Sequence, residues 1–136
     1  MLMAYLIKGG AQQLLDQRGE VAPYALRLEG AEAAPKIHFP QDSHSTANFD
    51  ELFELAAQWL RLDADGIEIV GVALISMLEN DADAEAAAVG AQLETPSGSI
   101  FLFYPCTRHG QRLQIGEFEV LEGLLVPEGI RWRLPH

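Results

Sequence analysis

Four consecutive runs of β-forming residues fill most of the second half of the chain, and they limit the possible folds more than any other feature. They span residues 67–78, 86–94, 99–106 and 113–120, and the turn Thr-Pro-Ser-Gly-Ser separates the second run from the third. Runs of this length joined by short turns pair as antiparallel strands. The first run is almost entirely apolar, so it is either a central strand covered on both faces or a segment with a helical piece. A further short strand is predicted at 130–134.

The first half of the chain adds a helix and two strands. Residues 2–18 predict a helix, because apolar side chains recur at spacings of three and four along one face. The pair Gly9-Gly10 weakens this helix, which leaves open a strand at 2–7 followed by a short helix at 11–18. Alternating apolar and polar residues predict paired strands at 24–29 and 35–40.

The strongest local signal begins at Asn48. Its side chain can cap a helix, and Glu51 three residues later can return a hydrogen bond to the Asn48 amide. An apolar stripe follows, which predicts a helix that lies on the sheet and ends by Gly66. The stripe consists of Phe49, Leu52, Phe53, Ala56, Trp59 and Leu60.

These elements together predict one α+β domain over residues 1–136. Its expected architecture is a twisted antiparallel β-sheet with two α-helices packed on one face, in the order α-β-β-α-β-β-β-β. A chain of 136 residues is long enough to bury a single core without metals or disulfides.

The stretch L-L-D-Q-R-G-E-V-A-P-Y-A-L-R-L, residues 14–28, resembles the opening of a group of small uncharacterised bacterial α+β proteins. In that group a helix ends at Gly-Glu, and a proline-aromatic pair opens the first strand; Val21 stands here where an aromatic residue is expected. The resemblance implies the same order of elements over most of the chain. The group has no established activity, so the resemblance transfers no functional residue.

The charge of the chain restricts its partners. Twenty acidic residues against nine basic ones give a formal net charge of −11, which would repel nucleic acid. The same charge suits a basic protein partner, although it also serves plain solubility. A single cysteine cannot form an intrachain disulfide, and neither a secretory signal nor a membrane-spanning run is present, so a cytoplasmic location is expected.

Cys106 and Arg112 have the spacing of the cysteine and arginine in protein tyrosine phosphatases. In such a loop the backbone amides and the arginine hold a phosphate while the thiolate attacks phosphorus. Leu113 stands where that family has a serine or threonine, and the residues that follow alternate like a strand rather than opening a helix. The stretch His-Gly-Gln-Arg therefore favours a hairpin turn, with Cys106 as a small apolar residue at a strand end.

The remaining polar clusters predict no metal or cofactor site. The acidic run 81–85 would begin an EF-hand loop with Ala86 where glycine is needed and Gln92 where the final glutamate belongs. One cysteine and four scattered histidines are too few for structural zinc, and His44 has no acid placed to orient it. The histidines are His38, His44, His109 and His136, and the two tryptophans, Trp59 and Trp132, are expected to pack in the core or on the sheet.

Two functions follow from these patterns. The first is a non-enzymatic acidic interaction protein, such as a neutraliser or chaperone of a basic protein partner. The alternative is a small cysteine-dependent phosphatase that uses Cys106 and Arg112, for which the spacing is the single argument.

Overall fold

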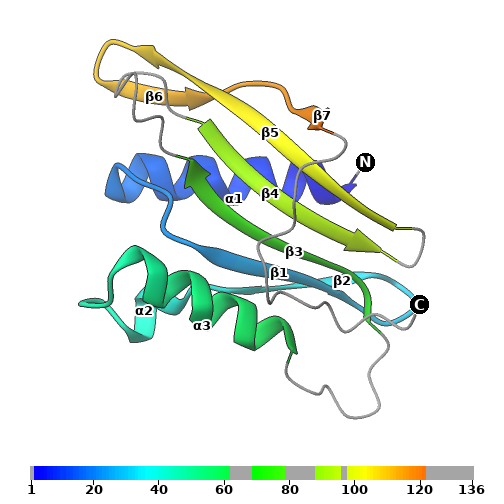
Figure 1. The fold of residues 1–136 in the computed structure, drawn as a ribbon. Helices are drawn as coiled ribbons and strands as arrows, with labels where there is room; N and C mark the ends of the chain where they lie inside the picture. The colour runs from blue at the N-terminus through cyan, green and yellow to red at the C-terminus, as the bar shows by residue number, and fades with distance from the viewer. Residues whose placement is uncertain (1, 62–68, 79–87, 96–97, 122–136) are drawn as a thin grey trace.

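The computed structural model describes residues 2–61, 69–78, 88–95 and 98–121. These residues form an α+β fold of three helices and seven strands, which confirms the predicted fold class (Figure 1). The elements are α1 (Leu2–Arg18), β1 (Tyr24–Glu29), β2 (Ala34–His38), α2 (Pro40–Ser43), α3 (Phe49–Arg61), β3 (Ile69–Leu78), β4 (Ala88–Thr95), β5 (Gly98–His109), β6 (Arg112–Ile115) and β7 (Glu119–Leu121).

The strands form one curled antiparallel sheet in the order β2-β1-β3-β4-β5-β6, and β7 also pairs with β5. The expected run at 67–78 is a strand throughout its described part, as β3. The expected strand at 113–120 is divided into β6 and β7. Between them the Gly116 amide donates to the carbonyl oxygen of Pro105 at 2.7 Å, which draws the chain out of regular pairing. The expected strand at 130–134 lies outside the described residues.

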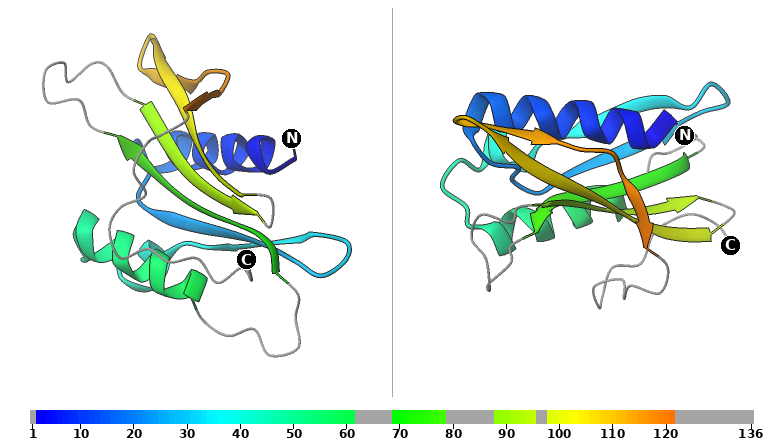
Figure 2. Two further views of the ribbon diagram at one scale, coloured as in Figure 1. Left: turned by 45° about the vertical axis from the view of Figure 1, so that its right-hand side comes forward. Right: turned by 90° about the horizontal axis from the view of Figure 1, so that it is seen from above.

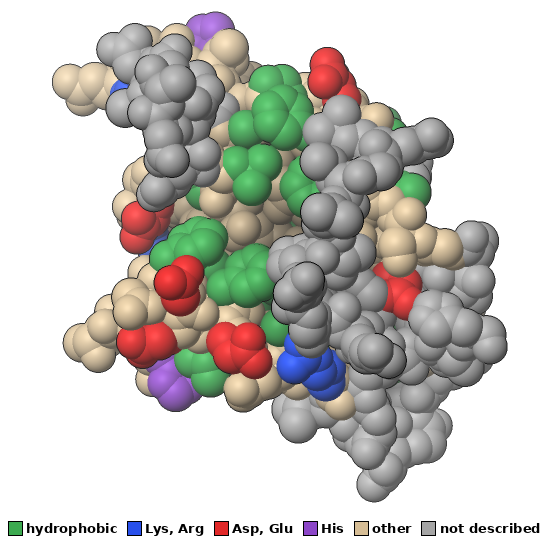
Figure 3. Space-filling view, viewed as in Figure 1, with side chains coloured by type: hydrophobic (Ala, Val, Ile, Leu, Met, Phe, Trp, Pro, Cys, Tyr) green, Lys and Arg blue, Asp and Glu red, His purple; other side chains and the backbone are tan. Residues whose placement is uncertain are grey.

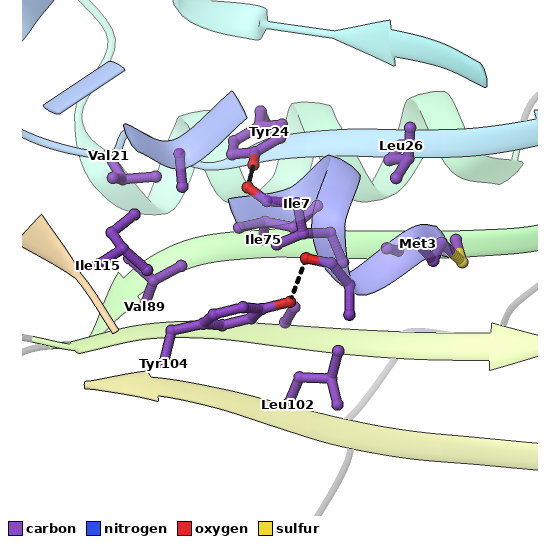
Figure 4. Close-up of a cluster of buried hydrophobic side chains, with 14 of the residues drawn as sticks. Met3, Ile7, Val21, Tyr24, Leu26, Ile75, Val89, Leu102, Tyr104 and Ile115 are labelled. Carbon is purple, nitrogen blue, oxygen red and sulfur yellow. Dashed lines mark hydrogen bonds between the residues drawn. The ribbon is translucent and has the colours of Figure 1, made fainter. Parts of the chain in front are cut away.

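Helix α1 is one continuous helix, so the alternative of a strand at 2–7 is wrong. It lies across the sheet and covers the larger of two buried apolar clusters (Figure 4). Two tyrosines of the sheet hold it there. The hydroxyl of Tyr24 donates to the carbonyl oxygen of Ile7 at 3.0 Å, and that of Tyr104 donates to the carbonyl oxygen of Ala4 at 2.8 Å. Burial raises the pKa of both phenols, so both stay protonated donors.

The two long helices lie on opposite faces of the sheet, and not on one face as expected (Figure 2). Strand β3 explains the difference. Ala73 and Ile75 face the α1 cluster, whereas Val72 and Leu74 belong to the smaller cluster beneath α3. Because a strand that is apolar on both sides must be covered on both sides, each helix takes one face.

Candidate functional site

Helix α3 begins at a side-chain cap. The backbone amide of Glu51 donates to Oδ1 of Asn48 at 2.9 Å, which confirms the predicted cap. Asp50 and Glu51 occupy the first turn, where their charge is favoured by the positive end of the helix dipole. The cap therefore fixes the first residue of the helix and, with it, which side chains of the first turn point to solvent.

The side of α3 that meets the sheet is made of small and aliphatic residues. Leu52, Ala56, Ala57 and Leu60 are buried, and the alanines allow the helix to approach the strands closely. The aromatic residues of the predicted stripe are less buried: Phe53 and Trp59 are half-buried against this cluster, and Phe49 is 46% exposed. The stripe is thus predicted correctly as a contact with the sheet, but its aromatic residues are not fully buried in that contact.

The opposite side of α3 is acidic and exposed. Asp50, Glu51 and Glu54 all point to solvent, and we call these three residues the acidic face. No ion pair among the described residues includes Asp50 or Glu51, and Glu54 has only a long contact of 3.9 Å with Arg61. Phe49 and Phe53 stack beside them with their centroids 6.3 Å apart. Figure 3 shows acidic and apolar side chains alternating over α3 at the lower left.

A small cavity adjoins the start of α3. It has a volume of about 140 Å³ and lies where the chain before β1, the end of β3 and the first turn of α3 meet. Val21, Pro23, Leu52 and Met77 contribute apolar walls, and Phe49 lines it as well. We call it the α3 pocket. Glu20 and Gln41 supply the polar side chains of its lining.

The stretch around Cys106 is a hairpin, as predicted. Strands β5 and β6 pair in the register Cys106↔Ile115 and His109↔Arg112, and Gly110 adopts a φ of 66° in the turn. Arg112 pairs with His109 and therefore shares its face of the hairpin. His109 is three residues after Cys106 on β5, and residues three apart on a strand face opposite sides. The Cys106 and Arg112 side chains therefore project from opposite faces. Cys106 lies within strand β5 and not at its end.

The electrostatic surroundings of these two residues also differ from those of a phosphate loop. The Arg112 guanidinium forms two hydrogen bonds with Asp16 of α1, at 3.0 and 3.1 Å, and these bonds lower the pKa of the Asp16 carboxyl. Burial raises the pKa of the Cys106 thiol, whereas a nucleophilic cysteine needs a lowered one. The geometry therefore gives Arg112 a structural role in joining α1 to the hairpin, and it gives no support to thiolate chemistry.

The partner of β6 on its outer edge is a side chain. The amide group of Gln12 donates to the carbonyl oxygen of Leu113 at 3.0 Å and accepts from the backbone amide of Ile115 at 2.8 Å. It thus pairs with the strand as a neighbouring strand would, and it removes two free backbone groups from a sheet edge.

A cluster of aromatic and charged side chains packs α3 against β1 and β2. The His38 ring stacks on Trp59 with centroids 5.1 Å apart, and the Arg27 guanidinium lies 4.3 Å from the centre of the Trp59 ring. Arg27 is also paired with Glu29 at 2.8 Å. Since each of these groups already has a partner within the cluster, its evident role is to hold α3 in place.

The other predicted groups form no site in the described structure. His44 and His109 are exposed, and no group of three or more His, Cys, Asp or Glu side chains in the described ranges could hold a metal ion. The acidic run 81–85, Trp132 and His136 lie outside those ranges. None of the described helices is long and apolar enough to cross a membrane.

Comparison with protein-family models, with curated proteins and with solved structures finds no match to this chain.

The sequence indicated the acidic residues of α3 only as partners of the helix dipole, and it gave no sign of the α3 pocket. The pocket joins residues such as Val21, Leu52 and Met77, which are far apart in the chain. The one sequence feature that bears on the pocket is Phe49. It is the first residue of the apolar stripe, and it lies at the start of α3, where the pocket is.

Proposed function

We propose that this protein is a non-enzymatic interaction protein, and that the acidic face of α3 binds a basic protein partner. The observation that carries the proposal is the exposed acidic face of Asp50, Glu51 and Glu54, together with a Phe49 that is 46% exposed at the start of the same helix. Carboxylates alone suit solubility, but the exposed ring of Phe49 at the edge of the acidic face does not serve solubility.

A lysine or arginine finds two kinds of attraction on this surface. The carboxylates attract its charge, and the stacked rings of Phe49 and Phe53 offer faces for a cation–π contact. Each such contact is worth only about 0.5–1 kcal/mol at an exposed site, so a useful affinity requires several basic residues on the partner. The net charge of −11 adds long-range attraction that speeds the encounter.

The proposed setting is the cytoplasm of a bacterial cell, where a neutraliser or chaperone of a basic protein would act. Its support is the single, half-buried cysteine, which suits a reducing compartment, together with the resemblance of residues 14–28 to small bacterial proteins.

The test is capture from an extract of the source cells by immobilised protein, with two charge variants. The first variant, D50N/E51Q/E54Q, neutralises the acidic face. The second, E32Q/E117Q/E119Q, removes the same charge from exposed positions elsewhere, including the exposed pair of Glu117 with Lys8, and serves as the charge-matched control. Thermal unfolding checks that both variants fold.

We expect the wild type and the control to retain a basic protein that is released when the salt concentration is raised from about 50 mM to 500 mM, because salt screens exposed charges. The D50N/E51Q/E54Q variant should not retain it. Equal loss of capture by both variants would mean that net charge alone is responsible. Equal capture by all three proteins, or retention of non-basic proteins only, would contradict the proposal.

A further inference from the structure

The geometry points to the α3 pocket as the anchor site for one apolar side chain of the basic partner, next to a lysine or arginine that pairs with Glu20. This inference rests on the proposed function and adds to it the kind of residue that the partner inserts. It predicts that the partner segment combines basic residues with one buried leucine, isoleucine or methionine.

The size of the pocket selects its occupant. Sites for small molecules and cofactors usually enclose about 300–1,000 Å³. The α3 pocket, at about 140 Å³, is well below this range. Apolar cavities of about 150 Å³ accept a single benzene-sized group, which is also the size of one apolar side chain. The pocket therefore fits an anchor residue and is too small for a cofactor.

The lining of the pocket suits an apolar side chain flanked by polar groups. Seven of its nine lining residues have apolar side chains, and Val21 and Leu52 are buried and therefore fixed. Polar atoms, including those of Glu20 and Gln41, share the accessible lining with them. Met77 is half-buried, and its unbranched side chain can adjust to different guests. Phe49 links the pocket to the acidic face, because it lines the one and stacks on Phe53 beside the other.

Charge determines what flanks the anchor. Glu20 lines the pocket and is exposed, and Asp50 and Glu51 follow Phe49 directly in the first turn of α3. An apolar residue seated in the pocket would therefore place a neighbour within reach of the Glu20 carboxylate. A basic neighbour gains from this arrangement and an acidic one is repelled, which is the complementarity that gives an interface its specificity.

The probe is a pair of dye-labelled ten-residue peptides of lysine and arginine that differ at one central position, leucine in one and serine in the other. Fluorescence anisotropy measures their binding, and the methyl resonance of Met77 reports on the pocket. Burial of the leucine should tighten binding by about 10- to 100-fold relative to the serine peptide. The leucine peptide alone should shift the Met77 methyl resonance.

Filling the pocket provides the matched test. Ala47 lines the pocket and is half-buried, so A47L should remove the preference for leucine while keeping the weaker binding of the serine peptide. A34L makes the same substitution at an exposed position of β2 and should keep the preference. If A47L does not fold, A22L fills the same pocket from another side. The shift of the Met77 methyl resonance tests occupancy of the pocket in the wild type, so it needs no variant.

The outcomes distinguish failure of the pocket inference from failure of the proposed function. Equal binding of both peptides that is lost in D50N/E51Q/E54Q would overturn the pocket inference and leave the acidic face intact. A preference for leucine that survives A47L, with the Met77 resonance unmoved, would also overturn it. Binding of neither peptide would contradict the proposed function and this inference together.

Discussion

Replacing Gly9 and Gly10 of α1 by alanine, one at a time, should change stability in opposite directions. Both glycines lie inside the same helix, where alanine is favoured over glycine by about 1 kcal/mol. Loss of chain entropy in the unfolded state is the same for both substitutions and cancels in the comparison. Any difference between the two variants must therefore come from what the new methyl group meets in the folded protein.

The surroundings of the two positions are different. A Cβ at Gly9 would meet nothing within 4 Å, whereas one at Gly10 would lie 3.2 Å from the hydroxyl oxygen of Tyr24. Tyr24 is 1% exposed, and its hydroxyl is held by Ile7, so it cannot move without weakening that hydrogen bond. Overpacking of this kind costs about 1–3 kcal/mol. We expect G9A to stabilise the protein by about 1 kcal/mol and G10A to destabilise it by about 1 kcal/mol.

Urea denaturation followed by tryptophan fluorescence measures both changes, provided that the slope of the transition stays constant. A third experiment isolates the cause. In a Y24F background the hydroxyl is absent, so G10A should approach the effect of G9A. Equal stabilisation by G9A and G10A in the wild-type background would refute the account of how α1 packs on Tyr24.

Four further predictions concern other parts of the structure. N48A should lower the free energy of unfolding by about 0.5–2 kcal/mol in urea denaturation, because the Glu51 amide loses its acceptor. L60A should lower it by about 2–5 kcal/mol, since Leu60 is 1% exposed on the side of α3 that meets the sheet. G110A should lower it by about 1–2 kcal/mol, since a φ of 66° disfavours any side chain there. Cys106, whose pKa is raised by burial, should react with iodoacetamide at pH 8 more slowly than a free thiol, and urea should restore the rate. Unchanged stability in any of the three variants, or a fast-reacting thiol, would contradict the corresponding contact.

The elements that depend on local sequence could be predicted, and the contacts between distant residues could not. The cap at Asn48 and the hairpin at Gly110 follow from a few neighbouring residues, and the structure has both. Gly10 reads in the sequence as a residue that weakens a helix. Its role depends on Tyr24, fourteen positions away, and no spacing rule relates the two.

The placing of the helices shows the same limit. The apolar run of β3 indicated cover on both faces, but a periodic stripe on a helix does not say which face of the sheet it will meet. The α3 pocket likewise depends on the distance between elements, because Val21 and Met77 come together only when β1 and β3 pair. Their contact includes a hydrogen bond from the Met77 amide to the carbonyl oxygen of Val21 at 3.2 Å.

The binding of the basic leucine peptide to purified protein at low and high salt tests the central claim most directly. At an ionic strength of 0.1 M exposed charges interact over about 10 Å, so attraction by the acidic face should weaken steeply as salt is added. We predict that the wild type and E32Q/E117Q/E119Q bind the peptide with similar affinity at low salt, and that D50N/E51Q/E54Q binds it at least about tenfold more weakly. An equal loss of affinity in both variants, or an affinity that does not respond to salt, would contradict a basic-partner site on α3.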